Sequence, residues 1–187
     1  MAQEDLRIQA DLAADGTLYR GYDARMRAVH DRHADRLAGI LSEQGWPGEA
    51  QVGPDGAQAA WLIAQHAIAQ PAFQRQAHSA LSAAARRGEV PAWQVASLED
   101  RIRTFEGRPQ RYGTQFDWDA SGQLSPLPIE DPLGVDERRQ AVGLRPLEEE
   151  IQIQQAAVAQ STERPPADWR ARQREMDAWF REVGWRS

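Results

Sequence analysis

The sequence predicts a mainly α fold: an irregular bundle of five to seven helices with one β-hairpin packed on it. Two observations support this prediction. Apolar residues recur at steps of three and four in several short stretches, and glycine or proline bounds most of these stretches. Between residues 111 and 130 the pattern changes to aromatic residues and threonine on both sides of the turn sequence Ala-Ser-Gly-Gln, which is typical of a hairpin.

The first half of the chain predicts five helices. They cover about residues 3–14, 22–44, 56–67, 71–87 and 91–106. Asp55 is a plausible N-cap for the third helix, after a turn at Val52–Gly56. Phe73, Ala77, Leu81 and Ala84 supply the predicted buried side of the fourth helix. The short connections favour antiparallel packing of neighbouring helices.

The second half begins with the hairpin, and Pro126 and Pro128 keep its second strand at an edge. Helices then follow at about 135–142, with Asp136 as a cap, and at 146–160. The segment 161–166 is a linker, and 167–183 forms a strongly amphipathic last helix. We therefore expect a helical domain over residues 1–160, followed by a linker and a C-terminal amphipathic helix over 161–187. The aromatic side of this last helix predicts that the helix folds back on the domain or self-associates. The alternative is that it docks on a protein partner.

Composition excludes several kinds of chemistry. The chain of 187 residues has no cysteine and no lysine, which rules out disulfides, thiolate catalysis, cysteine-bound metals and lysine Schiff bases. Its net charge of -6 argues against nucleic-acid binding. No run approaches the length of a transmembrane helix, and the N-terminus lacks the pattern of a secretory signal, so we expect a cytoplasmic protein that does not contact a membrane.

The helix Gly56–Ala67 is the first candidate for a functional site. At helical spacing, Ala59, Leu62, Ile63 and His66 share one face, and polar or aromatic side chains occupy the adjoining flank. An imidazole in a pocket can act as a general acid or base near neutral pH. The alternative is that His66 is a hydrogen-bonded core histidine.

The segment GRPQRYGTQF, residues 107–116, is the second candidate. Gln110, Tyr112, Thr114 and Gln115 place four hydrogen-bonding side chains in six positions. In a strand, Tyr112 and Thr114 point one way, and Gly113 and Gln115 the other. With glutamines of the first half they predict a Gln-lined polar pocket. The alternative is that these amides cap helix ends and hold the hairpin in place.

The predicted site therefore combines two sets of residues. His66 and Tyr112 are the candidate catalytic residues. The candidate ligand-binding residues are Trp46, Gln58, Trp61, Gln65, Gln74, Gln110 and Gln115. No cofactor motif is present, and no metal site is predicted.

Two further patterns were weighed against simpler interpretations. His30 and His33 are three residues apart on one helix face and can both reach one metal ion, but a third ligand would have to come from elsewhere in the fold. The arginines at 101, 103, 108 and 111 suit a carboxylate or phosphate, yet ion pairs with nearby acids such as Glu130 and Asp131 are the favoured interpretation.

Several motifs occur together in a fixed order: GWPG at 45–48, AWLIAQHA at 60–67, PAFQ at 71–74, GRPQRYGTQF at 107–116 and DPLGVDERRQAVGLRPLEE at 131–149. From about residue 23 to 151 the chain thereby resembles an uncharacterised bacterial family, a domain of unknown function. The resemblance implies a mostly helical fold with a small hairpin and no assigned activity. The family motifs include eight residues of this sequence: Trp46, Gln65, His66, Gln110, Tyr112, Gly113, Thr114 and Gln115. This sequence departs from the family pattern at His33, where an Asn or similar residue is expected. The last helix lies outside the resemblance.

Two hypotheses on function follow. The first is a bacterial small-ligand-binding domain, or an enzyme in which His66 is the acid/base and Tyr112 a hydrogen-bond donor. The second is a non-catalytic protein-interaction module, of an immunity or adaptor kind, that uses the C-terminal Trp-rich helix, with a homodimer or another protein as the partner.

Overall fold

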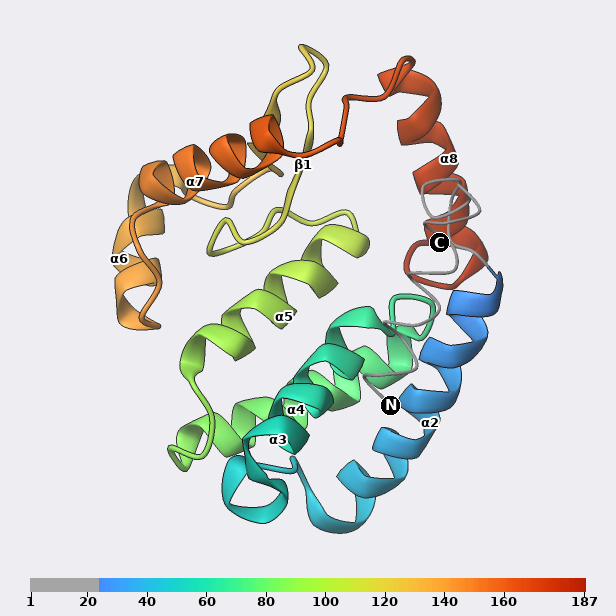
Figure 1. The fold of residues 1–187 in the computed structure, drawn as a ribbon, viewed down its shortest axis with the longest axis vertical. Coiled ribbons are helices and arrows are strands. Elements are labelled where there is room, and N and C mark those ends of the chain that lie inside the picture. The colour runs from blue at the N-terminus through green and yellow to red at the C-terminus, as the bar shows by residue number, and fades with distance from the viewer. Residues whose placement is uncertain (1–23) are drawn as a thin grey trace. The chain divides into compact units, whose positions relative to one another are not determined.

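The structure is a computed structural model that describes residues 24–187 (Figure 1). The predicted fold class is confirmed, because the described part is mainly helical and its only sheet is a two-stranded antiparallel hairpin. The predicted helix over 3–14 and the predicted start of the second helix at 22 lie outside the described residues. Within residues 24–187, no helix has the length and apolar character needed to cross a membrane.

The chain divides into two compact units, which meet in the sequence at Val90 and Pro91. The predicted boundary between residues 160 and 161 falls between two helices of the second unit.

The first unit packs three helices against one another: α2 (Ala24–Gln44), α3 (Glu49–His66) and α4 (Pro71–Arg86). Its apolar core comes from all three helices and the α2–α3 turn. The core includes Met26, Val29, Leu37, Leu41, Trp46, Trp61, Ile63, Phe73, Ala77 and Leu81. The predicted buried side of α4 is confirmed at all four positions. Pro71 begins this helix at the position where a missing N–H costs nothing.

Helix α3 starts earlier than the sequence predicts. The Gly48 carbonyl accepts hydrogen bonds from the Gln51 and Val52 N–H groups, which makes one helical turn before Gly53. Gly53 has φ 72° and kinks the helix there, a conformation that glycine adopts without steric cost. The helix therefore breaks within the predicted turn Val52–Gly56, but the predicted cap is wrong, because Asp55 lies inside the helix.

The buried face of α3 is also rotated relative to the prediction. Ala60, Ala64 and Gln65 are buried, whereas Ala59, Leu62 and His66 are only half-buried. Burial of the Trp61 indole, which is 6% exposed, orients the helix this way, because an indole removes more apolar surface from water than an alanine does.

The second unit contains the hairpin and five helical segments. They are α5 (Ala92–Phe105), β1 (Phe116–Trp118), β2 (Leu124–Pro126), the 3₁₀ helix η1 (Pro132–Gly134), α6 (Val135–Ala141), α7 (Leu147–Gln160) and α8 (Trp169–Glu182). Phe116 pairs with Pro126 and Trp118 with Leu124. Helix α7 packs along β2, and the Gln155 side chain donates to the Leu124 carbonyl at 3.1 Å.

Two local predictions in this unit are wrong. Residues 111–115 are not a strand, so the predicted alternation of side chains does not apply; only Gln110 forms a bridge, with Ile129. Their N–H groups donate instead to side chains within the unit, as described below. Asp136 does not cap α6. Its carboxylate accepts a hydrogen bond from the Leu147 N–H at 2.8 Å and so supports the start of α7.

Helix α8 folds back within the second unit. The Trp169 indole N–H donates to the Trp118 carbonyl at 2.8 Å. Phe180 and Trp185 are buried, and both rings lie against Phe105, with ring centroids 5.0 and 5.3 Å away. The aromatic side of this helix therefore belongs to the core of its own unit.

Candidate functional site

A layer of polar side chains lies inside the otherwise apolar first unit. We call it the histidine layer, and it consists of His30, His33, Gln65, His66 and Gln74. Helix α2 provides the first two, α3 the next two and α4 the last. His33 is 4% exposed and Gln74 is fully buried. Polar side chains that are buried or half-buried on three packed helices make this layer the candidate site in the unit.

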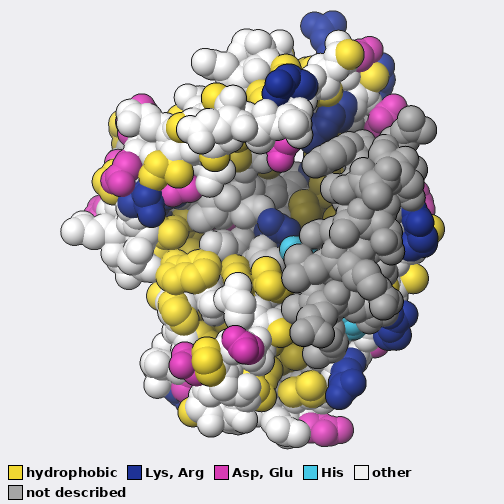
Figure 2. All heavy atoms as spheres, in the orientation of Figure 1, with side chains coloured by type: hydrophobic (Ala, Val, Ile, Leu, Met, Phe, Trp, Pro, Cys, Tyr) yellow, Lys and Arg dark blue, Asp and Glu magenta, His cyan; other side chains and the backbone are white. Residues whose placement is uncertain are grey.

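Within this layer two imidazoles from different helices are neighbours. The ring centroids of His30 and His66 are 5.2 Å apart, and the rings are tilted by 33°. His66 is the last residue of α3 and is half-buried, whereas His30 is 8% exposed. Histidine side chains reach the surface on the face drawn in Figure 2. The pair therefore has one member that solvent reaches and one that is nearly enclosed.

Gln74 adds an acceptor to the layer. Its side-chain nitrogen donates to the Ala64 carbonyl at 2.7 Å and to the Gln65 carbonyl at 3.3 Å. Among the described residues no donor reaches its side-chain oxygen. A buried acceptor of this kind calls for a hydrogen-bond donor from a bound molecule or ordered water.

Two carboxylates of α2, those of Asp31 and Asp35, lie beside the layer's histidines in the sequence. The Gln70 amide donates to the carboxylates of Asp31 and Asp35, at 3.3 and 3.2 Å. It also donates to the Asp31 carbonyl at 3.3 Å. These bonds tie the α3–α4 turn, which follows His66, to α2, which carries His30.

The other predicted residues of the first unit do not join this layer as ligand groups. Trp46 is 2% exposed and Trp61 is 6% exposed, and both are part of the apolar core. Gln58 is exposed on α3. Gln65 and Gln74 are buried, as a site residue or a structural residue would be.

The second predicted region is organised by a buried carboxylate that the sequence did not reveal. Asp100 of α5 is fully buried and accepts hydrogen bonds from the N–H groups of Arg111, Tyr112 and Thr114 at 2.6–3.1 Å. The Thr114 hydroxyl donates to it as well, at 2.9 Å. Burial raises the pKa of the Asp100 carboxyl, and these donors offset part of that rise.

Gln110 and Gln115 complete this arrangement. The Gln110 amide donates to the carbonyls of Gln115 and Leu127 at 3.0 and 2.7 Å, and its oxygen accepts the Gln115 N–H at 2.9 Å. The Gln115 side chain accepts from Arg101 at 3.2 Å. Both amides are thus engaged within the unit, which is the arrangement expected if they hold the loop and hairpin together.

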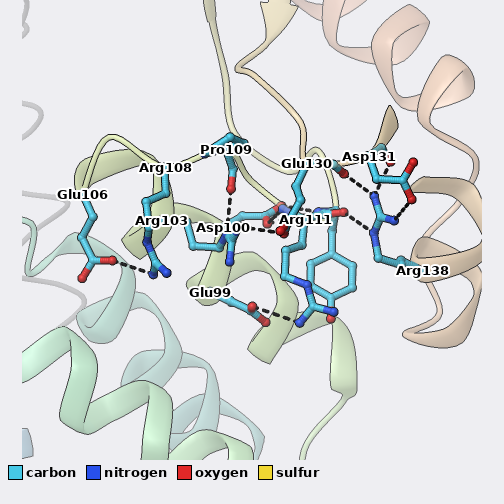
Figure 3. Close-up of polar contacts among 11 residues, drawn as sticks. Glu99, Asp100, Arg103, Glu106, Arg108, Pro109, Arg111, Glu130, Asp131 and Arg138 are labelled. Carbon is cyan, nitrogen blue, oxygen red and sulfur yellow. Dashed lines mark hydrogen bonds and ion pairs between the residues drawn. The ribbon is translucent and has the colours of Figure 1, made fainter. Parts of the chain in front are cut away.

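Two arginines support the same loop from α6. Arg139, 1% exposed, donates to the carbonyls of Tyr112 at 2.6 Å and Gly113 at 3.2 Å. Arg138 donates to the Arg111 carbonyl at 2.9 Å and to the Glu130 and Asp131 carbonyls (Figure 3). Asp100 and both arginines were not predictable as site residues, because all three lie in ordinary charged stretches of the sequence.

Tyr112 is half-buried in this loop. Burial raises the pKa of its phenol, and the negative charge of Glu99 adds to the rise. The phenol therefore stays protonated at neutral pH and can donate a hydrogen bond. Tyr112 and His66 belong to different units.

The arginine cluster forms ion pairs. Arg103 pairs with Glu130 at 2.7 Å, Arg108 with Glu106 at 2.6 Å, and Arg111 with Glu99 at 3.2 Å (Figure 3). Burial lowers the pKa of Arg101 to about 10, which leaves it a cation at neutral pH. In residues 24–187 no group of three or more His, Cys, Asp or Glu side chains is arranged to hold a metal ion.

The family comparison is consistent with this picture of an uncharacterised domain. A model described as "Family of unknown function (DUF6624)" matches residues 4–162. No curated protein and no solved structure matches the chain. The match begins nearer the N-terminus than the resemblance in the sequence suggested, and it ends before α8.

Proposed function

The chain belongs to the DUF6624 family, a family of unknown function, and from this premise we propose that it binds a small polar ligand through the histidine layer. The observation that carries the proposal is the His30–His66 pair, two imidazoles from different helices with ring centroids 5.2 Å apart. Its ligand is a molecule with at least one hydrogen-bond donor, which would meet the side-chain oxygen of Gln74.

The chemistry of imidazole supports ligand binding by the His30–His66 pair. A neutral imidazole offers one acceptor and one donor nitrogen, and it exchanges a proton near neutral pH. Two adjacent imidazoles can both hydrogen-bond to one polar ligand, one as donor and the other as acceptor. His66 is the more accessible member, so in an enzyme it is the residue we propose as general acid or base.

Of the predicted residues, His66, Gln65 and Gln74 stay in the proposed site. Tyr112 is left out because it belongs to the second unit. Gln110 and Gln115 are left out because their amides bind their own loop. We propose a cytoplasmic bacterial protein, which is in keeping with its cysteine-free composition.

Native mass spectrometry tests the proposal directly. The protein, purified at neutral pH, is weighed under native and denaturing conditions. We expect an excess mass in the native spectrum that disappears on denaturation and that is lost in His66→Ala and His30→Ala. Gln58→Ala is the matched control, because Gln58 lies on the same helix as His66 but is exposed, and it should keep the excess mass.

Three outcomes would contradict the proposal. The first is a bare mass for the wild-type protein. The second is an excess mass that both histidine variants retain while circular dichroism shows that they are folded. The third is an excess mass that Gln58→Ala loses as well, because the loss would then not be specific to the histidine layer.

The second candidate function, a protein-interaction module, needs a surface other than the aromatic side of α8. Phe180 and Trp185 of the C-terminal segment are buried in their own unit.

A further inference from the structure

The second unit contains a pocket that the histidine layer does not use. We call it the α5–α8 pocket, and its volume of about 330 Å³ is at the lower end of the range for small-molecule sites. Helix α5 and the loop after it form one side, the hairpin region a second and the C-terminal segment a third. The C-terminal side lies beyond residue 162, where the family match ends.

The walls of this pocket are largely apolar and aromatic. Two phenyl rings, a thioether and apolar side chains of the hairpin region line it: Phe105, Leu127, Pro128, Met176 and Phe180. The two phenyl rings lie against each other, with centroids 5.0 Å apart. Aromatic rings and a thioether make favourable contacts with a further ring, so these walls favour an aromatic ligand.

Arg186 holds the C-terminal side of the pocket in place. Its guanidinium donates to the Phe105 carbonyl at 2.8 Å and to the Thr104 carbonyl at 2.9 Å. It also pairs with Asp177 and lies over the Phe180 ring, 4.5 Å from the centroid. These contacts between α5 and the C-terminal segment form the pocket before a ligand arrives, and a preformed pocket reduces the cost of binding.

The charged side chains of the pocket balance one another. Two arginines and two aspartates line it: Arg108, Asp117, Asp177 and Arg186. Asp177 and Arg186 pair with each other. Arg108 pairs with Glu106 at 2.6 Å, and Asp117 pairs with Arg172 at 2.6 Å. An ionic ligand would lose hydration here without gaining an unpaired counter-charge, so the pocket favours an uncharged molecule.

The Gln173 amide is available to a ligand in this pocket. Gln173 lies on α8 and is half-buried, and among residues 24–187 its side chain makes no hydrogen bond. It differs in this from Gln110 and Gln115, whose amides bind their own loop. A side-chain amide has both a donor and an acceptor, and a second amide is the group that complements both at once.

We propose that the α5–α8 pocket binds an uncharged aromatic molecule that carries an amide group. Its ring contacts Phe105, Met176 and Phe180, and its amide bonds to the Gln173 side chain. The proposal does not depend on the histidine layer, because every residue that lines the pocket belongs to the second unit. It adds a second ligand site, in which aromatic contacts and one amide replace the imidazoles.

Three probes with the same ring system test the preference for an uncharged ligand. Naphthamide is neutral at neutral pH, naphthoate is an anion and naphthamidine is a cation. Each is titrated into the isotopically labelled full chain and followed by NMR. We expect saturable binding of naphthamide, with the largest shifts at the Gln173 side-chain amide and near Phe105 and Met176. The two ions should bind at least about tenfold more weakly, because neither gains an unpaired counter-charge.

The variant Gln173→Leu tests the role of the amide. Leucine has a similar size but no hydrogen-bonding atoms, so the affinity for naphthamide should fall about tenfold, the effect of losing one or two hydrogen bonds. Naphthalene, which has no amide, should bind the variant at least as well as the wild-type protein. Gln160→Leu is the matched control, because Gln160 is exposed at the end of α7 and outside the pocket, and it should leave the affinity unchanged. His66→Ala should also leave it unchanged.

Four results would overturn the proposal. The first is the absence of saturable naphthamide binding to the wild-type protein. The second is equal affinity for the three probes. The third is a folded Gln173→Leu variant, checked by circular dichroism, that binds naphthamide as tightly as the wild-type protein. The fourth is a set of shifts centred on the first unit. If Gln173→Leu does not fold, the comparison of the three probes on the wild-type protein decides.

Discussion

The backbone N–H of Tyr112 donates a hydrogen bond to both carboxylate oxygens of Asp100, with N···O distances of 3.1 Å each. This contact joins α5 to the loop of residues 107–115, and the neighbouring N–H groups of Arg111 and Thr114 strengthen it. A loop with glycine at two positions and several polar side chains is thereby given a single conformation. The loop resembles a binding loop in sequence, but its backbone donors are directed inward.

Replacing Asp100 with Asn should therefore destabilise the second unit. The amide group would bring two N–H donors to a place where the loop already presents donors. We expect a loss of about 2–4 kcal/mol in the free energy of unfolding, the range for a broken buried hydrogen-bonded charge. Amide hydrogen exchange at Arg111, Tyr112 and Thr114 measures the loss.

Two variants serve as controls for Asp100→Asn. Thr114→Val removes only one hydroxyl donor and should cost about 1 kcal/mol. Glu99→Gln disrupts a surface ion pair next to Asp100 in the sequence and should cost less than about 1 kcal/mol. Equal losses for all three variants would contradict the central role of Asp100.

Gly113 is the position in this loop that should least tolerate a side chain. It has φ 68°, and a Cβ would lie 2.8 Å from a methyl group of Leu147 and 3.1 Å from one of Ile129. Gly113→Ala combines a left-handed backbone penalty with overpacking, and we expect a loss of about 2–4 kcal/mol in urea unfolding.

Gly143→Ala is the matched control for that substitution. Gly143 has φ 78°, but among residues 24–187 no atom beyond its chain neighbours lies within 4 Å of a Cβ there. It should therefore show the backbone penalty alone, about 1–2 kcal/mol. If the two variants lose the same stability, packing around Gly113 does not contribute.

The sequence predicted the helices well because helical periodicity and glycine or proline breakers are local signals. Helix α4 shows this, with Phe73, Ala77, Leu81 and Ala84 buried as expected. The rotation of α3 was not predictable, because it depends on where the Trp61 indole finds space among residues of other helices. The kink at Gly53 depends on a backbone angle that composition does not specify.

The candidate site was predictable only in part. His66 was singled out from its helix, but its neighbour His30 comes from α2, and nothing in the sequence relates the two helices. Asp100 lies 11–14 residues before the groups that it binds, within an ordinary Leu-Glu-Asp-Arg stretch. Hydrogen bonds from a side chain to the backbone of a distant loop leave no periodic trace in the sequence.

Phe180 should contribute more to stability than any exposed residue of α8. It is 5% exposed and contacts Phe105, with ring centroids 5.0 Å apart. Phe180→Ala should cost about 3–5 kcal/mol, the range for removing a buried aromatic ring. Arg174→Ala, on the exposed side of the same helix, should change the free energy of unfolding by less than about 0.5 kcal/mol. Chemical denaturation of both variants measures the difference, and a small loss for Phe180→Ala would show that α8 is only weakly attached.

The hairpin turn should lose stability in acid because of Asp119. Its carboxylate accepts hydrogen bonds from the N–H groups of Ser121 and Gln123 at 2.8 and 3.0 Å, and from the hydroxyls of Ser121 and Ser125 at 2.6 and 3.0 Å. These bonds lower the pKa of Asp119 to about 2, below its ordinary value of 3.8. A lowered folded-state pKa means that the unfolded turn binds the proton first. The stabilisation is therefore complete above pH 4 and is lost as the pH falls through about 2.

Amide hydrogen exchange and NMR shifts of Ser121 and Gln123 should report this loss of stability in the hairpin turn. Asp119→Asn cannot take up this proton, so it should remove the pH dependence. A turn that stays equally protected through this range in the wild-type protein would contradict the role of Asp119.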